Sequence, residues 1–130
     1  MQEIKTREEV STLVHAFYRK IRTDDILGPI FNNRIPNDKW PDHLVKLTDF
    51  WETNLFGVAR FKGNPTQKHV ELDRDMNHAI GTLHFDRWLA LWRKTVDELF
   101  VGERAAKAKA TAERIGSVQL RVIERYRVEE

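Results

Sequence analysis

The first regular feature of the chain is a run of apolar residues at helical spacing near its N-terminus. They share one face of a helix and are Val10, Leu13, Val14, Phe17 and Ile21. This period predicts an amphipathic helix over about residues 7–22. Thr6 and Glu9 have the spacing of a capping box, which marks the start of the helix.

A second apolar stripe of the same period follows a broken region. Gly28-Pro29 is expected to interrupt the chain, and residues 32–39 are expected to form a polar loop. Pro41 suits the first turn of the next helix, and Gly57 is a natural stop. The stripe between them consists of Leu44, Leu47, Phe50, Trp51 and Leu55.

The second half of the chain predicts one short helix and two long ones. The short helix begins at Pro65 and carries His69, and residues 73–81 after it are polar and irregular. Thr82 is a plausible cap for the next helix, which Gly102 ends. That helix has the strongest stripe: Phe85, Trp88, Leu89, Trp92, Val96, Leu99 and Phe100. The last helix is expected over about residues 103–127.

The whole pattern predicts an all-α fold. No segment alternates apolar and polar residues as a half-buried strand does. The length of 130 residues suits a single domain spanning residues 1–130. A hydrophobic fraction of 41% beside a charged fraction of 32% is typical of a helical core with a well-solvated surface.

Composition narrows the possible chemistry. The chain has no cysteine, so thiolate metal sites and cysteine nucleophiles are excluded. Its 22 basic and 20 acidic residues are interspersed, so the sequence shows no basic stripe of the kind that binds nucleic acid. No apolar run is long enough for a membrane span, and the N-terminus has no apolar signal core. A cytoplasmic location is the default expectation.

Among the five histidines, His69 has the least ordinary setting. It lies on a short helix rather than a long packing helix, and a single imidazole there suits the axial ligand of haem iron. His43 lies on or beside an apolar stripe, where a histidine is usually a core or boundary residue. A zinc site of His69, His78 and His84 is an alternative, although the last two do not have helical i,i+4 spacing.

Several aromatic residues are candidates for the wall of a cofactor pocket. Phe31, Phe50, Trp51 and Trp88 could line a flat apolar ligand, with Tyr18 and His43 as polar tips. From the residues alone, Tyr18 is expected to be a boundary tyrosine at the edge of its stripe. Trp88 is expected to pack in the core, with its indole N–H in need of an acceptor.

Ordered blocks of sequence resemble the group III truncated haemoglobins. The first is Phe17-Tyr18 followed by Leu27-Gly28-Pro29-Ile30-Phe31, and the second is His43 before Phe50-Trp51. Two more are Asn64-Pro65 through Lys68-His69, and His84 through Leu89. The blocks run in the order of that family from about residue 10 to residue 100.

The resemblance implies a shortened globin fold, in which two helix pairs form a two-over-two sandwich around haem b. It implies that His69 is the proximal iron ligand and the single metal ligand from the protein, which leaves a pentacoordinate iron. It implies that Tyr18, His43 and Trp88 are distal ligand-binding residues. Phe31 would pack on the haem face, and Leu47 and Phe50 would line the pocket from the helix of His43.

The resemblance also implies a function. Such a protein binds O2, NO or another diatomic ligand under several hydrogen-bond donors. Tight binding would favour redox chemistry on O2, NO or peroxide, as in a dioxygenase or peroxidase, and an electron-donating reductase would be the partner. Oxygen transport or gas sensing is the alternative within this class. The rival from another class is a haem-free helical interaction module, in which these residues are merely core.

Overall fold

The structure is a computed structural model that describes residues 2–58 and 81–129, with side chains described as far as Arg121. Its helices are α1 (Arg7–Thr23), α2 (Gly28–Arg34), α3 (Trp40–Phe56), α5 (Thr82–Leu99) and α6 (Glu103–Glu129). A short 3-10 helix, η1 (Asn37–Lys39), precedes α3. Within these ranges, the sole β pairing is an isolated bridge between Gln2 and Phe100, so the predicted all-α fold is confirmed.

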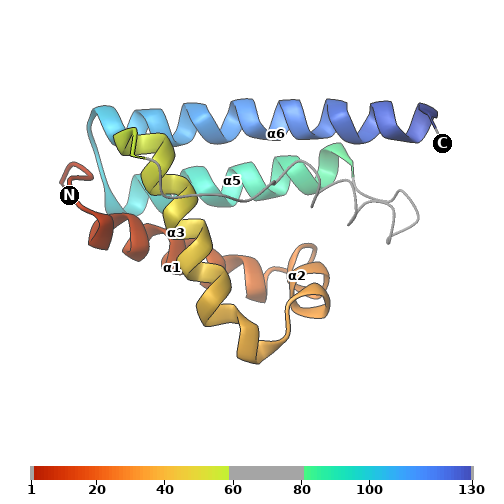
Figure 1. Cartoon of the computed structure of the whole chain (residues 1–130), viewed down its shortest axis with the longest axis horizontal. Coiled ribbons are helices and arrows are strands. Elements are labelled where there is room, and N and C mark those ends of the chain that lie inside the picture. The colour runs from red at the N-terminus through yellow and green to blue at the C-terminus, as the bar shows by residue number, and fades with distance from the viewer. Residues whose placement is uncertain (1, 59–80, 130) are drawn as a thin grey trace.

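Four long helices make two layers (Figure 1). α5 and α6 run side by side along the long axis of the molecule, while α1 and α3 cross each other and form the second pair. α1 also packs on α5, and α3 packs on α6, so each pair covers the other. This arrangement is the predicted two-over-two sandwich.

The predicted start of α1 is confirmed by its cap. Thr6 Oγ1 accepts a hydrogen bond from the Glu9 amide at 3.2 Å, and Glu9 Oε1 accepts one from the Thr6 amide at 3.1 Å. These two bonds satisfy amide groups that a helix N-terminus otherwise leaves unpaired. The stripe of α1 is buried as expected.

The prediction of a break at Gly28-Pro29 and a polar loop over residues 32–39 was wrong, because Gly28-Pro29 begins α2 and the supposed loop holds the end of α2 and η1. Proline tolerates the first turn, where its missing amide hydrogen has no helical partner to lose. Asp24 orders the preceding turn, since Asp24 Oδ2 accepts hydrogen bonds from the amides of Ile26 and Leu27 at 3.1 and 3.0 Å. Gly28 is needed there, because a Cβ at this position would lie 2.7 Å from the Arg22 carbonyl oxygen.

Smaller corrections concern the ends of the other helices. Gly81, not Thr82, precedes the first residue of α5 as its N-cap. Pro41 lies in the first turn of α3 as predicted, and Gly57 ends α3 in the left-handed conformation with φ of 72°. The predicted short helix that begins at Pro65 lies outside the described residues.

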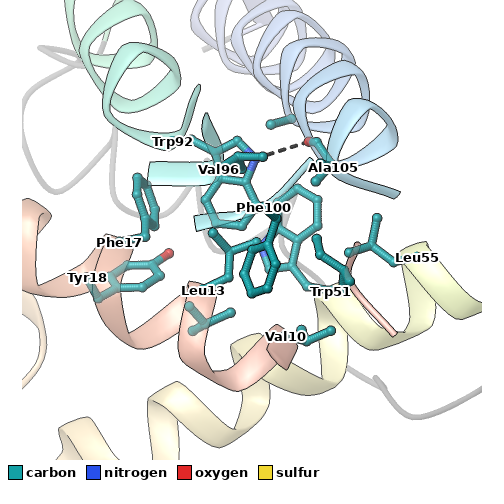
Figure 2. Packing of buried hydrophobic residues seen from close by; sticks show 14 of the residues in the cluster. Val10, Leu13, Phe17, Tyr18, Trp51, Leu55, Trp92, Val96, Phe100 and Ala105 are labelled. Atoms are coloured by element: carbon teal, nitrogen blue, oxygen red, sulfur yellow. Dashed lines mark hydrogen bonds between the residues drawn. The ribbon is translucent and has the colours of Figure 1, made fainter. Parts of the chain in front are cut away.

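The core is built around Trp92, which is completely buried (Figure 2). Its ring stacks on Trp51 with centroids 4.3 Å apart and contacts Phe17 edge-on at 4.9 Å. Its indole Nε1–H donates to the carbonyl oxygen of Ala108 at 3.0 Å, the dashed line in Figure 2. One side chain of α5 therefore joins α1, α3 and α6.

The N-terminal segment fastens the turn between α5 and α6. Glu3 accepts hydrogen bonds from the amides of Glu103 and Arg104 at 2.8 and 3.0 Å, so its carboxylate caps the N-terminus of α6. Arg104 in turn donates to the carbonyl of Ile4 at 3.0 Å. The pKa of Glu3 is lowered, because these amide hydrogen bonds outweigh the opposing effect of partial burial. Residues 2–4 thus form a strap that holds the turn between α5 and α6.

Candidate ligand-binding site

Tyr18 is at the centre of the site. It is 6% exposed, so the expectation of a boundary tyrosine was wrong. The edge of the α1 stripe is covered from two sides, by Phe31 of α2 at 6.0 Å between ring centroids and by His43 of α3 at 6.1 Å. The apolar pattern along α1 cannot show that Tyr18 is buried, because the residues that cover it come from other helices.

The polar neighbour of the Tyr18 hydroxyl is Trp88 of α5. Because an indole N–H can only donate, Trp88 acts toward the phenol oxygen as a hydrogen-bond donor and lowers the pKa of Tyr18. Burial raises the pKa of Tyr18 far above its ordinary value, and the bond from Trp88 opposes only part of this rise. The hydroxyl therefore keeps its proton at neutral pH and can donate it to another acceptor.

His43 brings a second donor from α3. Its side chain is half-buried, and its ring meets that of Tyr18 edge-on with an interplanar angle of 83°. Burial lowers the pKa of His43, and the positive charge of Lys46 lowers it further. The imidazole is consequently neutral at pH 7, with one nitrogen carrying a proton and the other free to accept one.

Four of the predicted pocket residues are partly buried and pack against the main core: Phe31, Leu47, Phe50 and Trp88. Of these, Phe31 contacts the Tyr18 ring directly. Trp51, which was a further candidate for the wall, is instead 2% exposed and stacked on Trp92 in the core. Partly buried apolar side chains near polar side chains suit a flat apolar ligand with a polar group bound at one face.

Two contributors to the site were missed at the sequence level. Trp40 contacts the rings of both Tyr18 and His43, at 5.9 and 5.3 Å between centroids. It lies three positions before His43, a spacing that places two helical residues on one face, but the predicted apolar stripe of this helix began at Leu44 and did not include it. The other contributor is Arg87, next to Trp88.

Arg87 joins α5 to the turn between α1 and α2. Its guanidinium lies 2.7 Å (Nε) and 2.6 Å (Nη2) from Asp24 Oδ1, and the Asp24 side chain is 2% exposed. Asp24 thus accepts from Arg87 with one oxygen and from two backbone amides with the other. This link fixes the residue beside Trp88 relative to the end of α1, the helix that carries Tyr18.

The Asp24–Arg87 link predicts a defined response to acid. Hydrogen bonds from Arg87 and the two amides lower the pKa of Asp24, despite the opposing effect of burial. The stabilisation is therefore complete above the unfolded-state pKa of about 3.9 and is lost as pH falls through the lower folded-state pKa. Asp24→Asn is expected to be less stable than wild type at neutral pH and to lose less stability on acidification, as urea midpoints at several pH values will measure.

The control for this prediction is Asp25→Asn, which removes an adjacent exposed carboxyl group. It is expected to keep the acid response of the wild type. An Asp24→Asn variant whose urea midpoint follows the wild-type pH curve would show that the Arg87 link contributes nothing to acid stability.

The described histidines other than His43 are poorly suited to bind a metal. His15 is exposed on α1, with its Nδ1 2.8 Å from the carbonyl of Ser11. His84 Nδ1 accepts the Gly81 amide hydrogen at 3.1 Å, so the neutral ring carries its proton on Nε2 and offers no free nitrogen to iron. Within residues 2–58 and 81–121, no group of three potential ligands gathers around a common point. His69 and His78 lie outside the described residues, and so does the zinc alternative that uses them.

Comparison with solved structures defines the class of protein. The crystal structure of a group III truncated hemoglobin from Campylobacter jejuni superposes with a TM-score of 0.84 and 29% sequence identity. The match covers 97% of this chain and 98% of that one. The fold is therefore that of a truncated haemoglobin.

Sequence comparison then assigns the family. A curated group 3 truncated hemoglobin from Campylobacter jejuni is 32% identical over 100 residues, which are 75% of each chain. No family model matches the chain. With this relative and this fold, the chain belongs to the group III truncated haemoglobins, and the resemblance seen in the sequence is confirmed.

Family membership implies a haem cofactor and a diatomic gas as ligand. The described residues fit such a group, since polar side chains from three helices, with Tyr18 buried and His43 and Trp88 partly buried, lie close to partly buried apolar rings. The helices of the described part include none that is both long and apolar enough to cross a bilayer.

Proposed function

We propose that this protein holds haem b through His69 and binds O2, NO or a similar diatomic ligand beside Tyr18, His43 and Trp88. When bound, haem would supply an iron atom that can take up such gases. The observation that supports this best is the meeting of three polar side chains from α1, α3 and α5 inside an aromatic surround.

Tyr18 is the principal donor in this proposal. Trp88 donates its N–H to the Tyr18 oxygen, which leaves the phenolic hydrogen free for a gas molecule that carries partial negative charge. A hydrogen bond from an already polarised hydroxyl is stronger than one from an isolated hydroxyl. The chain of donors therefore runs from Trp88 through Tyr18 to the ligand.

His43 has a different role in the same proposal. Because its pKa is lowered by burial and by Lys46, the ring is neutral and can both give and take a proton. Donors that hold the ligand tightly make a poor carrier, so we propose redox chemistry on O2, NO or peroxide in preference to oxygen transport. A reductase partner would then return electrons to the protein.

Tyr18→Phe tests the donor role. A hydrogen bond to a charged acceptor contributes about 1.5–3 kcal/mol, and each 1.4 kcal/mol changes a rate or affinity about tenfold. We expect O2 to dissociate from Tyr18→Phe about tenfold to a hundredfold faster than from wild type, as stopped-flow mixing with a competing gas will measure. Trp88→Phe should show a smaller increase, because it removes only the group that polarises Tyr18.

Two outcomes would contradict the proposal at different levels. Unchanged O2 dissociation in both variants would remove Tyr18 and Trp88 as donors while leaving a haem protein. A purified wild-type protein with no Soret band and no iron, even after incubation with haem, would instead favour the haem-free interaction module.

A further inference from the structure

Three rings form a closed cluster at the edge of the site. The centroid of Trp40 is 5.3 Å from that of His43 and 5.9 Å from that of Tyr18, and the last two are 6.1 Å apart. Trp40 is 3% exposed, whereas the His43 side chain is only half-buried. The imidazole is therefore packed between a buried tyrosine and a buried tryptophan, with its remaining side less covered.

Trp40 itself is covered by Arg22. The guanidinium carbon lies 4.6 Å from the centre of the Trp40 ring, a cation–π contact. The guanidinium is fixed in turn by two asparagines: Nε donates to Asn32 Oδ1 at 3.0 Å and Nη2 donates to Asn37 Oδ1 at 2.7 Å. Arg22 thus joins α1, α2 and η1 on the outer side of the first residue of α3.

Within the described part of the chain, no hydrogen bond holds the Trp40 ring in place. Its indole Nε1–H is buried and has no acceptor there. Buried indole N–H groups normally find a partner, because leaving one unpaired costs free energy. The Trp40 ring is held instead by packing in the core and by its contacts with Tyr18, His43 and Arg22, so a change at Arg22 can move the ring.

We propose that Trp40, clamped by Arg22, is a positioning residue that confines His43 against Tyr18 and so controls how often the imidazole moves away from the bound gas. This inference rests on the proposed function, because it assigns a determinant of access to the same site. Trp40 does not touch the ligand in this account. It acts through His43, and Arg22 acts through Trp40.

The test compares four variants of the haem-loaded protein. Trp40→Leu removes the aromatic wall, Trp40→Phe keeps a wall but removes the N–H, and Arg22→Met keeps the apolar stem without the guanidinium. Arg7→Met is the matched control, because Arg7 is another arginine of α1 that binds α3, through Asp49 and Glu52, outside the ring cluster. CO is the probe, since it accepts hydrogen bonds weakly and its association rate after flash photolysis reports access.

We expect Trp40→Leu to raise the CO association rate about fivefold or more, because His43 then spends more time away from the site. Arg22→Met should raise it about twofold to threefold, and Trp40→Phe and Arg7→Met should stay within about twofold of wild type. Thermal unfolding of each variant, followed by circular dichroism, will confirm that the fold is retained.

A second readout does not depend on gas binding. Titration of His43 by NMR should show its pKa rising toward the ordinary histidine value in Trp40→Leu, because the ring becomes more hydrated. The charged group that acts on the pKa of His43 is Lys46 of α3, while Tyr18 of α1 packs on the ring and Arg22 lies beyond Trp40. Because Arg22 is argued to act on His43 only through Trp40, the CO rate is the diagnostic measurement for Arg22→Met.

The inference is overturned if Trp40→Leu keeps both the wild-type CO rate and the wild-type His43 pKa while His43→Leu changes the CO rate. The proposed function would survive that result. It is also overturned if Trp40→Phe behaves like Trp40→Leu, because the N–H and not the ring would then confine His43. Should Trp40→Leu fail to fold, an unchanged CO rate in Arg22→Met overturns the inference in its place.

Discussion

A His69→Ala variant is expected to fold but to lose most of its haem. The reason is the distribution of the five histidines. His43 belongs to the cluster around Tyr18, His15 is exposed on the outside of α1, and the accepting nitrogen of His84 is taken by a backbone amide. His69 is the one that the family resemblance makes the iron ligand, and iron without that ligand is held only by contacts to the porphyrin.

The measurement is the ratio of Soret absorbance to protein absorbance after purification, together with the iron content. His84→Ala is the matched control and is expected to keep wild-type haem, although it loses the Gly81 hydrogen bond at the start of α5. Added imidazole should restore a Soret band to His69→Ala by filling the space that the side chain leaves. Normal haem in His69→Ala with loss in His78→Ala or His84→Ala would show that the ligand has been misassigned.

Trp92→Ala is expected to cost about 3–5 kcal/mol in the free energy of unfolding. The indole is completely buried, stacks on Trp51 and donates to the Ala108 carbonyl, so its removal leaves a large cavity and loses a buried hydrogen bond. The free energy of unfolding of a whole domain is only about 5–15 kcal/mol, so the variant will be marginally folded at best. Urea unfolding, followed by circular dichroism, gives the difference from the shift in midpoint.

Leu83→Ala is the control for this measurement. Leu83 lies on the same helix but is 63% exposed, so its truncation should change stability by less than about 0.5 kcal/mol. Trp92→Phe should fall between the two, because it keeps an aromatic ring against Phe17 and Trp51 but has no donor for Ala108. A loss below about 1 kcal/mol in Trp92→Ala would mean that the core closes over the missing ring.

The long helices could be predicted from the sequence because their signals are local. Thr6 and Glu9 mark the start of α1 within four residues of sequence. Gly57 ends α3 because its own backbone adopts the left-handed conformation. The error at Gly28-Pro29 has the opposite cause. The same two residues can end one helix or begin another, and the choice depends on how Asp24 orders the turn before them.

The site was predictable only in part. Resemblance supplied Tyr18, Phe31, His43 and Trp88, and the structure brings them together. Periodicity alone placed Tyr18 at the edge of the α1 stripe, because the sequence of one helix does not show which residues of other helices cover it. Trp40 and the Asp24–Arg87 link were missed for a related reason, since Trp40 packs on Tyr18 of α1 and Asp24 pairs with Arg87 of α5, and both contacts join residues far apart in the sequence.

The strap formed by Glu3 has a consequence for how the chain assembles during synthesis. Its carboxylate accepts from the amides of Glu103 and Arg104, which are 100 and 101 residues further along. A ribosome must therefore complete α5 and the turn after it before this contact can form. Most of the polypeptide has been synthesised by then. Contacts of such separation slow folding, so we place the closure of the strap among the late events, after α1 has met its neighbouring helices.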